Sequence, residues 1–151
     1  MKSNKTRFDL IDLNVRTLWQ SVRKMYNKEA IKYGVTYGIG FTLLSIDPKK
    51  GTPSTLIGPI MGVEANSLSR LLKKMETKKL IKRKTNPDDG RGVIILLTKE
   101  GLKKRDITKN KVLKFNRLIK DNITKEELNI FLKTTNTIKN LSSENTVFKN
   151  K

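Results

Sequence analysis

The sequence predicts a mainly α-helical chain with one small β-hairpin, and three observations support this fold class. Apolar residues recur every three or four positions through most of the chain, which is the period of an amphipathic helix. The pattern changes around residues 80–97, where two short apolar runs flank a polar loop. The 151 residues include 33 lysines and arginines against 14 acids, a net charge of +19. The fold therefore presents a strongly basic surface.

The first element is a long helix over residues 6–33, which Gly34 ends. Its apolar positions share one stripe: Phe8, Ile11, Val15, Leu18, Trp19, Val22, Met25 and Tyr26. A helix of this length exceeds what a small domain needs to cover itself. We therefore expect it to reach a second subunit.

Three shorter helices follow. Thr36 caps one that ends near Ile46, and Thr52-Pro53 starts another, with a capping hydroxyl and proline at the first helical position. Pro59 predicts a kink in that helix and Gly62 a turn after it. The third runs over residues 64–79, with Leu68, Leu71, Leu72 and Met75 on its buried face and Asn66, Ser67, Arg70, Lys73 and Lys74 opposite.

A hairpin comes next, from Leu80-Ile81 to the returning strand Val93–Leu97. Its loop, within N-P-D-D-G-R-G, is rich in acids and could suggest a calcium loop or a catalytic pair. However, Asp88 and Asp89 are adjacent rather than spaced as calcium ligands are, and Arg91 would repel the ion. Asp-Gly between two strands predicts a tight turn instead.

Two more helices complete the chain. Thr98 caps the first, over residues 99–120, whose polar opening third is expected to face solvent. T-K-E-E from Thr124 is a capping box for the second, which ends near Leu141. The polar tail after it is expected to be disordered.

Composition excludes several classes of function. The chain has no cysteine and no histidine, which removes disulfides, thiol nucleophiles, catalytic triads and nearly all zinc chemistry. No phosphate-binding loop accompanies the acids, so we expect no enzyme, no metal site and no cofactor. The start of the chain has no apolar signal core, and Val93–Leu97 is too short to cross a bilayer. We therefore expect a cytoplasmic protein that does not contact a membrane.

The order of elements is helix, tight turn, helix and two-stranded hairpin, which is the winged helix-turn-helix arrangement. In that fold the second helix enters the major groove of DNA and the hairpin, or wing, reaches the neighbouring minor groove. Small polar residues at the start of the helix can approach base edges. Lys73, Lys74, Lys78 and Lys84 can lie near phosphates.

These residues resemble the multiple-antibiotic-resistance regulator (MarR) family. The family's wing signature, D-x-R followed by a strand closing in L-T-x-x-G, matches Asp89-Gly90-Arg91 and then Leu97–Gly101. Residues 68–76 resemble its recognition helix and residues 80–83 its first wing strand. Two positions depart from the pattern. Lys79 stands where the family usually has glycine, and Gly90 stands where many members carry a second wing arginine.

The resemblance implies a sequence-specific regulator of transcription, a repressor, that binds a palindromic double-stranded DNA operator as a homodimer. The implied fold is mainly α with a small β-wing. It comprises a dimerisation helix (1–33), a winged helix-turn-helix DNA-binding domain (34–101), C-terminal dimerisation helices (102–141) and a tail (142–151). The implied DNA contacts are Asn66, Ser67, Ser69, Arg70, Lys73 and Lys74 from the recognition helix and Lys84, Asp89 and Arg91 from the wing.

The resemblance also implies a small amphipathic or aromatic ligand that lowers DNA affinity. Trp19, Tyr26, Tyr33 and Tyr37 are candidate pocket residues, but aromatic packing between helices is the explanation that we favour for them. Arg70 could pair with Asp89 instead of reading a base, and Asp89 is expected to orient a side chain rather than face phosphate. Lys82 and Lys103–Arg105 are expected to be solvated charge.

Two other classes of function remain open. The runner-up is a constitutive or architectural nucleic-acid binder of the same fold without an effector. A winged helix that binds proteins is a third possibility, which the charge of +19 disfavours.

Overall fold

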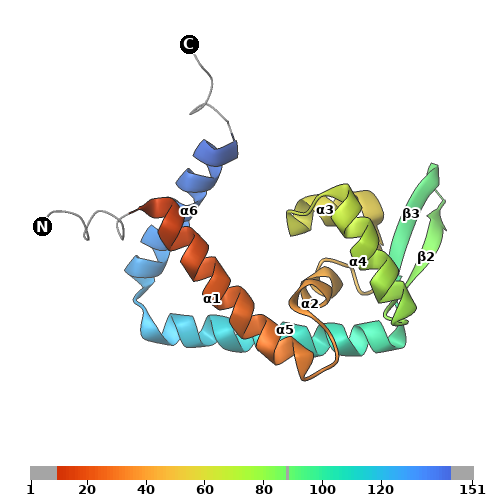
Figure 1. The fold of residues 1–151 in the computed structure, drawn as a ribbon, viewed down its shortest axis with the longest axis horizontal. Helices are drawn as coiled ribbons and strands as arrows, with labels where there is room; N and C mark the ends of the chain where they lie inside the picture. The colour runs from red at the N-terminus through yellow and green to blue at the C-terminus, as the bar shows by residue number, and fades with distance from the viewer. Residues whose placement is uncertain (1–9, 88, 144–151) are drawn as a thin grey trace, which may run out of the picture. The chain divides into compact units, whose positions relative to one another are not determined.

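The computed structural model describes residues 10–87 and 89–143, and the side chains of Asp89 and Arg91 lie outside that description. The described residues form a mainly helical chain with a small antiparallel sheet (Figure 1), which confirms the predicted fold class. The elements are α1 (Ile11–Ile31), α2 (Tyr37–Leu44), β1 (Thr52–Pro53), α3 (Ser54–Met61), α4 (Ala65–Thr77), β2 (Ile81–Asn86), β3 (Asp89–Leu97), α5 (Lys99–Asn122) and α6 (Lys125–Ser143).

The chain divides into two compact units, Met1–Lys109 and Asn110–Lys151. The first unit has a buried core, in which side chains from α2, α3 and α4 pack on one face of the sheet. The core residues are Val35, Ile39, Leu43, Ile46, Ile57, Leu68, Leu72, Met75, Leu80, Ile81 and Ile95. Burial of these apolar side chains is the main term that stabilises the first unit.

The sheet has three strands, in the order β1-β3-β2, and the short strand β1 was not predicted. Thr52 pairs with Ile95 and Pro53 with Ile94, so α3 begins at Ser54 rather than at Thr52-Pro53. The Thr52 hydroxyl does not cap α3. It accepts a hydrogen bond from the Asp47 backbone N–H (2.9 Å) and donates to the Ser45 carbonyl (3.4 Å), which closes the loop before β1.

The helix ends differ from the predictions by a few residues. α1 ends at Ile31 rather than at residue 33, and the predicted start at residue 6 lies outside the described residues. α3 continues through Pro59 to Met61, and Gly62 follows with a φ of 62°. α6 continues to Ser143, two residues past its predicted end, and the rest of the predicted tail lies outside the described residues.

The opening third of α5 belongs to the first unit and packs against its other elements instead of facing solvent. Gly101 is buried there, and a Cβ at this position would overlap the Leu80 carbonyl oxygen. Thr108 packs against Gly40 of α2, and the Arg105 side chain is 17% exposed. The Lys104 side chain is 22% exposed and lies 3.4 Å from the Glu100 carboxylate. The expectation that Lys103–Arg105 is solvated therefore holds for Lys103 but is wrong for Lys104 and Arg105. The long side chain of Arg105 lies along the packed face in spite of its charge.

Several helices carry apolar side chains that remain exposed. On α1 these are Ile11, Val15, Leu18, Trp19, Met25 and Ile31. In the second unit they are Leu113, Leu118, Ile119, Ile130, Phe131, Leu132 and Leu141. No residue of α1 or α6 is buried in the part of each helix that the structure describes.

Candidate nucleic-acid interface

Helix α4 has one face in the core and one in solvent. Leu68, Leu72 and Met75 recur at helical spacing and are 7%, 2% and 0% exposed, so they fix the rotation of the helix about its axis. Gly62 ends α3 in the left-handed conformation and allows the sharp turn into α4. The pair α3–α4 thereby forms the predicted helix-turn-helix.

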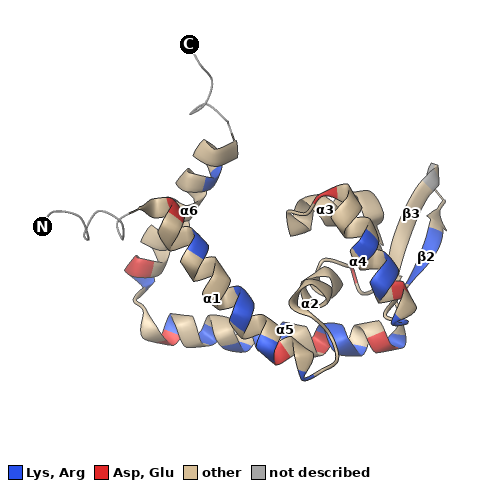
Figure 2. Cartoon of the chain, in the orientation of Figure 1, with Lys and Arg blue, Asp and Glu red and all other residues tan. Residues whose placement is uncertain are grey.

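The opposite face of α4 holds every recognition-helix residue that the sequence predicted. Asn66, Ser67, Ser69, Arg70, Lys73 and Lys74 are all exposed. Polar amides and hydroxyls lie in the first two turns, and the lysines follow in the third. Figure 2 marks in blue the Lys and Arg positions along α4 and along strand β2.

The wing is the hairpin of β2 and β3. Ile81 pairs with Leu97 and Thr85 with Val93, whereas the next pair joins Asn86 to Asp89. Gly90, Arg91 and Gly92 therefore lie in a bulge of β3 with no partner on β2. Lys84 is exposed on β2.

The bulge corrects the predicted turn. β2 ends at Asn86 and β3 begins at Asp89, so Asp89 and Gly90 belong to a strand rather than to the tight turn that Asp-Gly predicted. The side chains of Asp89 and Arg91 lie outside the described residues. The predicted pairing of Asp89 with Arg70 therefore stays a prediction.

The turn between α4 and β2 sets where the wing starts. Lys79 has a φ of 55°, the left-handed conformation that glycine most often adopts after the end of a helix. The Thr98 hydroxyl donates to the Lys79 carbonyl (2.7 Å) and lies 3.1 Å from the Leu80 carbonyl. The same oxygen accepts from the Gly101 N–H (3.0 Å), as predicted for the cap of α5. One threonine thus joins the base of the wing to α5.

Sequence reasoning missed Arg83 of β2. Its Nε donates to the Glu76 carboxylate of α4 at 3.1 Å, which joins the recognition helix to the wing. The strand pattern carried a signal for this position, since Arg83 is two residues after the buried Ile81 and therefore lies on the same face of the sheet.

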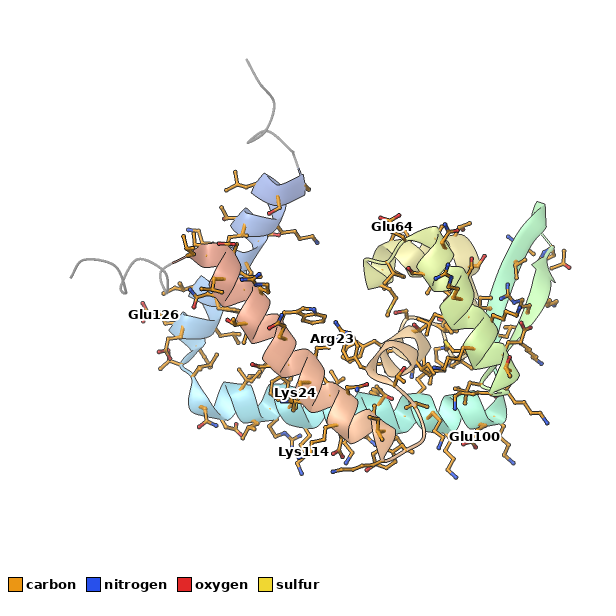
Figure 3. All side chains as sticks on the ribbon, viewed as in Figure 1. Arg23, Lys24, Glu64, Glu100, Lys114 and Glu126 are labelled. Carbon is orange, nitrogen blue, oxygen red and sulfur yellow. The ribbon has the colours of Figure 1, made fainter. Side chains whose placement is uncertain are left out.

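A hollow of about 750 Å³ lies between α1, α2 and the α3–α4 turn. Its charged lining residues are Arg23 and Lys24, and Figure 3 shows Arg23 on the side of α1 that faces α2. The other lining residues are Trp19, Gln20, Asn27, Thr36, Tyr37, Gly38, Met61, Gly62, Val63 and Leu71. The hollow therefore combines a basic, amide-bearing wall with an apolar one.

The four candidate pocket aromatics do not share one environment. Trp19 and Tyr37 line the hollow, with their rings edge to face at 5.7 Å. Tyr26 packs against Tyr37 and Phe41 at 6.4 Å and 5.2 Å, and Tyr33 is not among the lining residues. Burial raises the pKa of both Tyr26 and Tyr37. Both phenols therefore stay neutral at physiological pH.

The described residues contain no group of three or more acidic side chains placed to hold a metal ion. None of their helices combines the length and the apolar character needed to span a bilayer.

Comparisons with known proteins agree with this geometry. Residues 40–93 match the model of the MarR family. The fold is similar to the DNA complex of MepR from S. aureus, with 22% identity, a TM-score of 0.77 and coverage of 89% of this chain and 97% of that chain. It is also similar to the transcriptional regulator SlyA (16% identity, TM-score 0.79, 93% and 99% covered).

A third similar structure is the PcaV regulator from Streptomyces coelicolor in complex with its natural ligand (16% identity, TM-score 0.77, 94% and 99% covered). At these identities the likeness establishes the fold. No curated protein matches the chain significantly.

Proposed function

We propose that this chain, which carries a MarR-family domain at residues 40–93, is a transcription regulator that binds a specific double-stranded DNA sequence. The exposed face of α4 carries the proposal. Three buried apolar residues of α4 fix the rotation of the helix, so that this face presents amides, hydroxyls and cations to solvent. MepR, which has a similar fold, was solved in complex with DNA. This supports DNA as the partner of the present chain.

The contacts divide into two kinds. Asn66, Ser67 and Arg70 lie where a helix in the major groove presents its side chains to base edges. Lys73, Lys74 and Lys84 neutralise phosphates, which sets the register of the protein on the duplex but carries no sequence information. Arg91 enters the minor groove from the wing, and its bulge allows the strand to bend toward the DNA.

The acting species is a homodimer on a palindromic operator. The apolar side chains that α1 leaves exposed support a partner helix, since clustered exposed apolar residues mark interaction surfaces. Two copies related by a twofold axis then place two α4 helices on two half-sites. A dimer bound there represses by occupying the operator.

A small aromatic anion releases the dimer from DNA. The hollow beside Trp19 offers an aromatic wall, and both of its charged lining residues, Arg23 and Lys24, are cations. It spans α1 and the turn between α3 and α4, so a ligand there biases the recognition helix relative to the dimerisation helix. PcaV, which has a similar fold, was solved in complex with its natural ligand, which supports a bound ligand in this chain as well.

Selection of bound fragments from a random duplex pool tests the DNA-binding function. We expect a palindromic site with a large preference over scrambled duplex, and an affinity that falls steeply with salt. Asn66→Ala should relax base preference at one position per half-site by ~1–3 kcal/mol. Lys73→Ala, on the same face of α4, should instead weaken all sequences alike. Equal affinity for every sequence at every salt would establish the architectural binder.

The single tryptophan provides the test of the ligand. Benzoate and larger aromatic carboxylates should quench Trp19 fluorescence and lower operator affinity, because Trp19 lines the hollow. Arg23→Gln should weaken both effects. The matched variant Arg16→Gln, on α1 but outside the lining residues, should leave both unchanged. A full aromatic acid panel that neither quenches Trp19 nor changes operator affinity would leave the chain a regulator without this effector.

A further inference from the structure

A second hollow, of about 370 Å³, lies between α3, α4 and β2. Its polar lining residues are Ser54 and Thr55 of α3, Ser69 of α4 and Arg83 of β2. Ser69 is exposed and precedes Arg70, so the hollow adjoins the face of α4 described above. The inference drawn from this hollow rests on the proposed function. It adds Ser54, Thr55 and Arg83, which the sequence patterns did not mark, to the predicted contact Ser69.

The sheet register explains how Arg83 reaches this hollow. Arg83 pairs with Ile95, which is 0% exposed, and residues directly opposite in antiparallel strands share a face. Arg83 therefore emerges on the core side of the sheet, beyond Ile81. Its side chain is 39% exposed, so the guanidinium extends past the core to the rim beside α4.

Glu76 holds the guanidinium at that rim. The carboxylate accepts from Nε at 3.1 Å, and the terminal amino groups carry the other N–H donors of the fork. A carboxylate next to a DNA-binding face repels phosphate. This repulsion must be offset by a favourable interaction of Glu76. Holding the Arg83 guanidinium in one orientation is such an interaction.

We propose that this hollow is a seat for one DNA backbone phosphate, with Arg83 as the binding cation, Glu76 as its positioning residue and the hydroxyls of Ser54, Thr55 and Ser69 as further donors. Guanidinium binds phosphate through paired N–H donors, which a lysine cannot do. A backbone contact on this side of α4 fixes how deeply the helix enters the groove, and therefore which bases Asn66 reaches.

Salt titrations of Arg83→Gln test the contact. The slope of log affinity against log salt should fall by about 0.9 in magnitude, with about fivefold weaker binding that is uniform across operator and scrambled duplex. Lys82→Gln removes the same charge one residue away, from the other face of β2, and should change the slope less. An unchanged slope in Arg83→Gln, or an equal change in Lys82→Gln, overturns the seat.

Glu76→Gln tests the positioning role. We expect it to weaken binding although it removes a negative charge, and to have no such effect in the Arg83→Gln background. Glu64→Gln makes the same charge change at the start of α4, where Figure 3 labels this exposed residue, and should not weaken binding. Stronger binding in Glu76→Gln would make Glu76 a competitor for Arg83 and overturn the role.

Three controls keep these outcomes distinct. Arg83→Lys keeps the charge and should retain the salt slope while losing affinity, and melting curves establish that each variant is folded.

Potassium phosphate and sodium sulfate at equal ionic strength should compete equally with DNA. Selective competition by phosphate would make the hollow a free-phosphate site and overturn the inference. If wild type binds no duplex at all the proposed function fails, whereas binding without an Arg83 effect removes the seat alone.

Discussion

Lys79 has a left-handed backbone conformation, which glycine adopts more readily than any other residue. Among the described residues it is the one non-glycine with positive φ, at 55°. A side chain in the left-handed region brings Cβ close to the following carbonyl and costs about 1 kcal/mol. The backbone stays there because the Lys79 N–H donates to the Glu76 carbonyl (2.8 Å) and its own carbonyl accepts from Thr98.

Lys79→Gly should therefore stabilise the protein. We expect a gain of about 1 kcal/mol in the free energy of unfolding, since glycine adopts this φ without the steric cost. Lys78→Gly removes the same charge from a residue with a φ of −77° and should destabilise the protein by about 0.5–1 kcal/mol. Urea denaturation at one protein concentration measures both. A loss of stability in Lys79→Gly would show that the lysine side chain itself stabilises the turn.

Single residues of the site were predictable where one periodicity decides exposure. The outward face of α4 follows from its spacing of leucines, and all six predicted residues on it are exposed. Strand alternation could have placed Arg83 on the core side of the sheet, but its ion pair with Glu76 was not predictable. The packing of Arg105 was not predictable either, because long arginine side chains can lie along a core face and still reach outward. Charge alone does not tell a solvated arginine from one that packs along the core.

At the scale of elements, local side-chain chemistry decided which predictions held. The capping box of α6 is present as predicted. The Thr124 N–H donates to the Glu127 carboxylate (2.7 Å), and the Glu127 N–H donates to the Thr124 hydroxyl (3.1 Å). Strand β1 was missed because its two residues are defined by pairing with Ile94 and Ile95, far along the chain, and proline beside a threonine is an equally good helix start.

The capping box predicts a pH dependence. The hydrogen bonds from the Thr124 N–H and hydroxyl lower the pKa of Glu127. A carboxyl whose folded-state pKa is lowered contributes stability above its unfolded pKa, and this contribution is lost as pH falls through the folded value. Glu127→Gln keeps a hydrogen-bond acceptor but does not titrate. It should therefore show a smaller loss of stability between about pH 5 and pH 3 than wild type.

Denaturation across this pH range measures the effect. Glu126→Gln removes the same charge from the neighbouring first-turn position and serves as the control. If Glu126→Gln and Glu127→Gln flatten the pH profile equally, the effect is one of net charge and not of the cap.

At the scale of the whole molecule, the described helices leave many apolar side chains exposed. On α1, Ile11, Val15, Leu18 and Met25 are exposed, and with the half-buried Val22 they follow a 4-3-4-3 spacing. This is the seam that packs against another helix. Burial of such side chains contributes about 1.5–3 kcal/mol each, so a second copy is the simplest source of the missing contacts. A single sequence could predict the seam but not its partner, because the pattern is the same for any helix that covers it.

Leu18→Lys tests the homodimer directly. A lysine at the centre of the seam places like charges opposite each other in a twofold interface, so the variant should sediment as a monomer of 17.3 kDa where wild type sediments at twice that mass. Gln20→Lys adds the same charge on the other side of α1, toward the hollow, and should stay dimeric. The monomeric variant should also lose most of its preference for the palindrome, since each copy then holds one half-site alone. A wild type that is monomeric at micromolar concentration, or a Leu18→Lys variant that stays dimeric, contradicts the assignment of this seam.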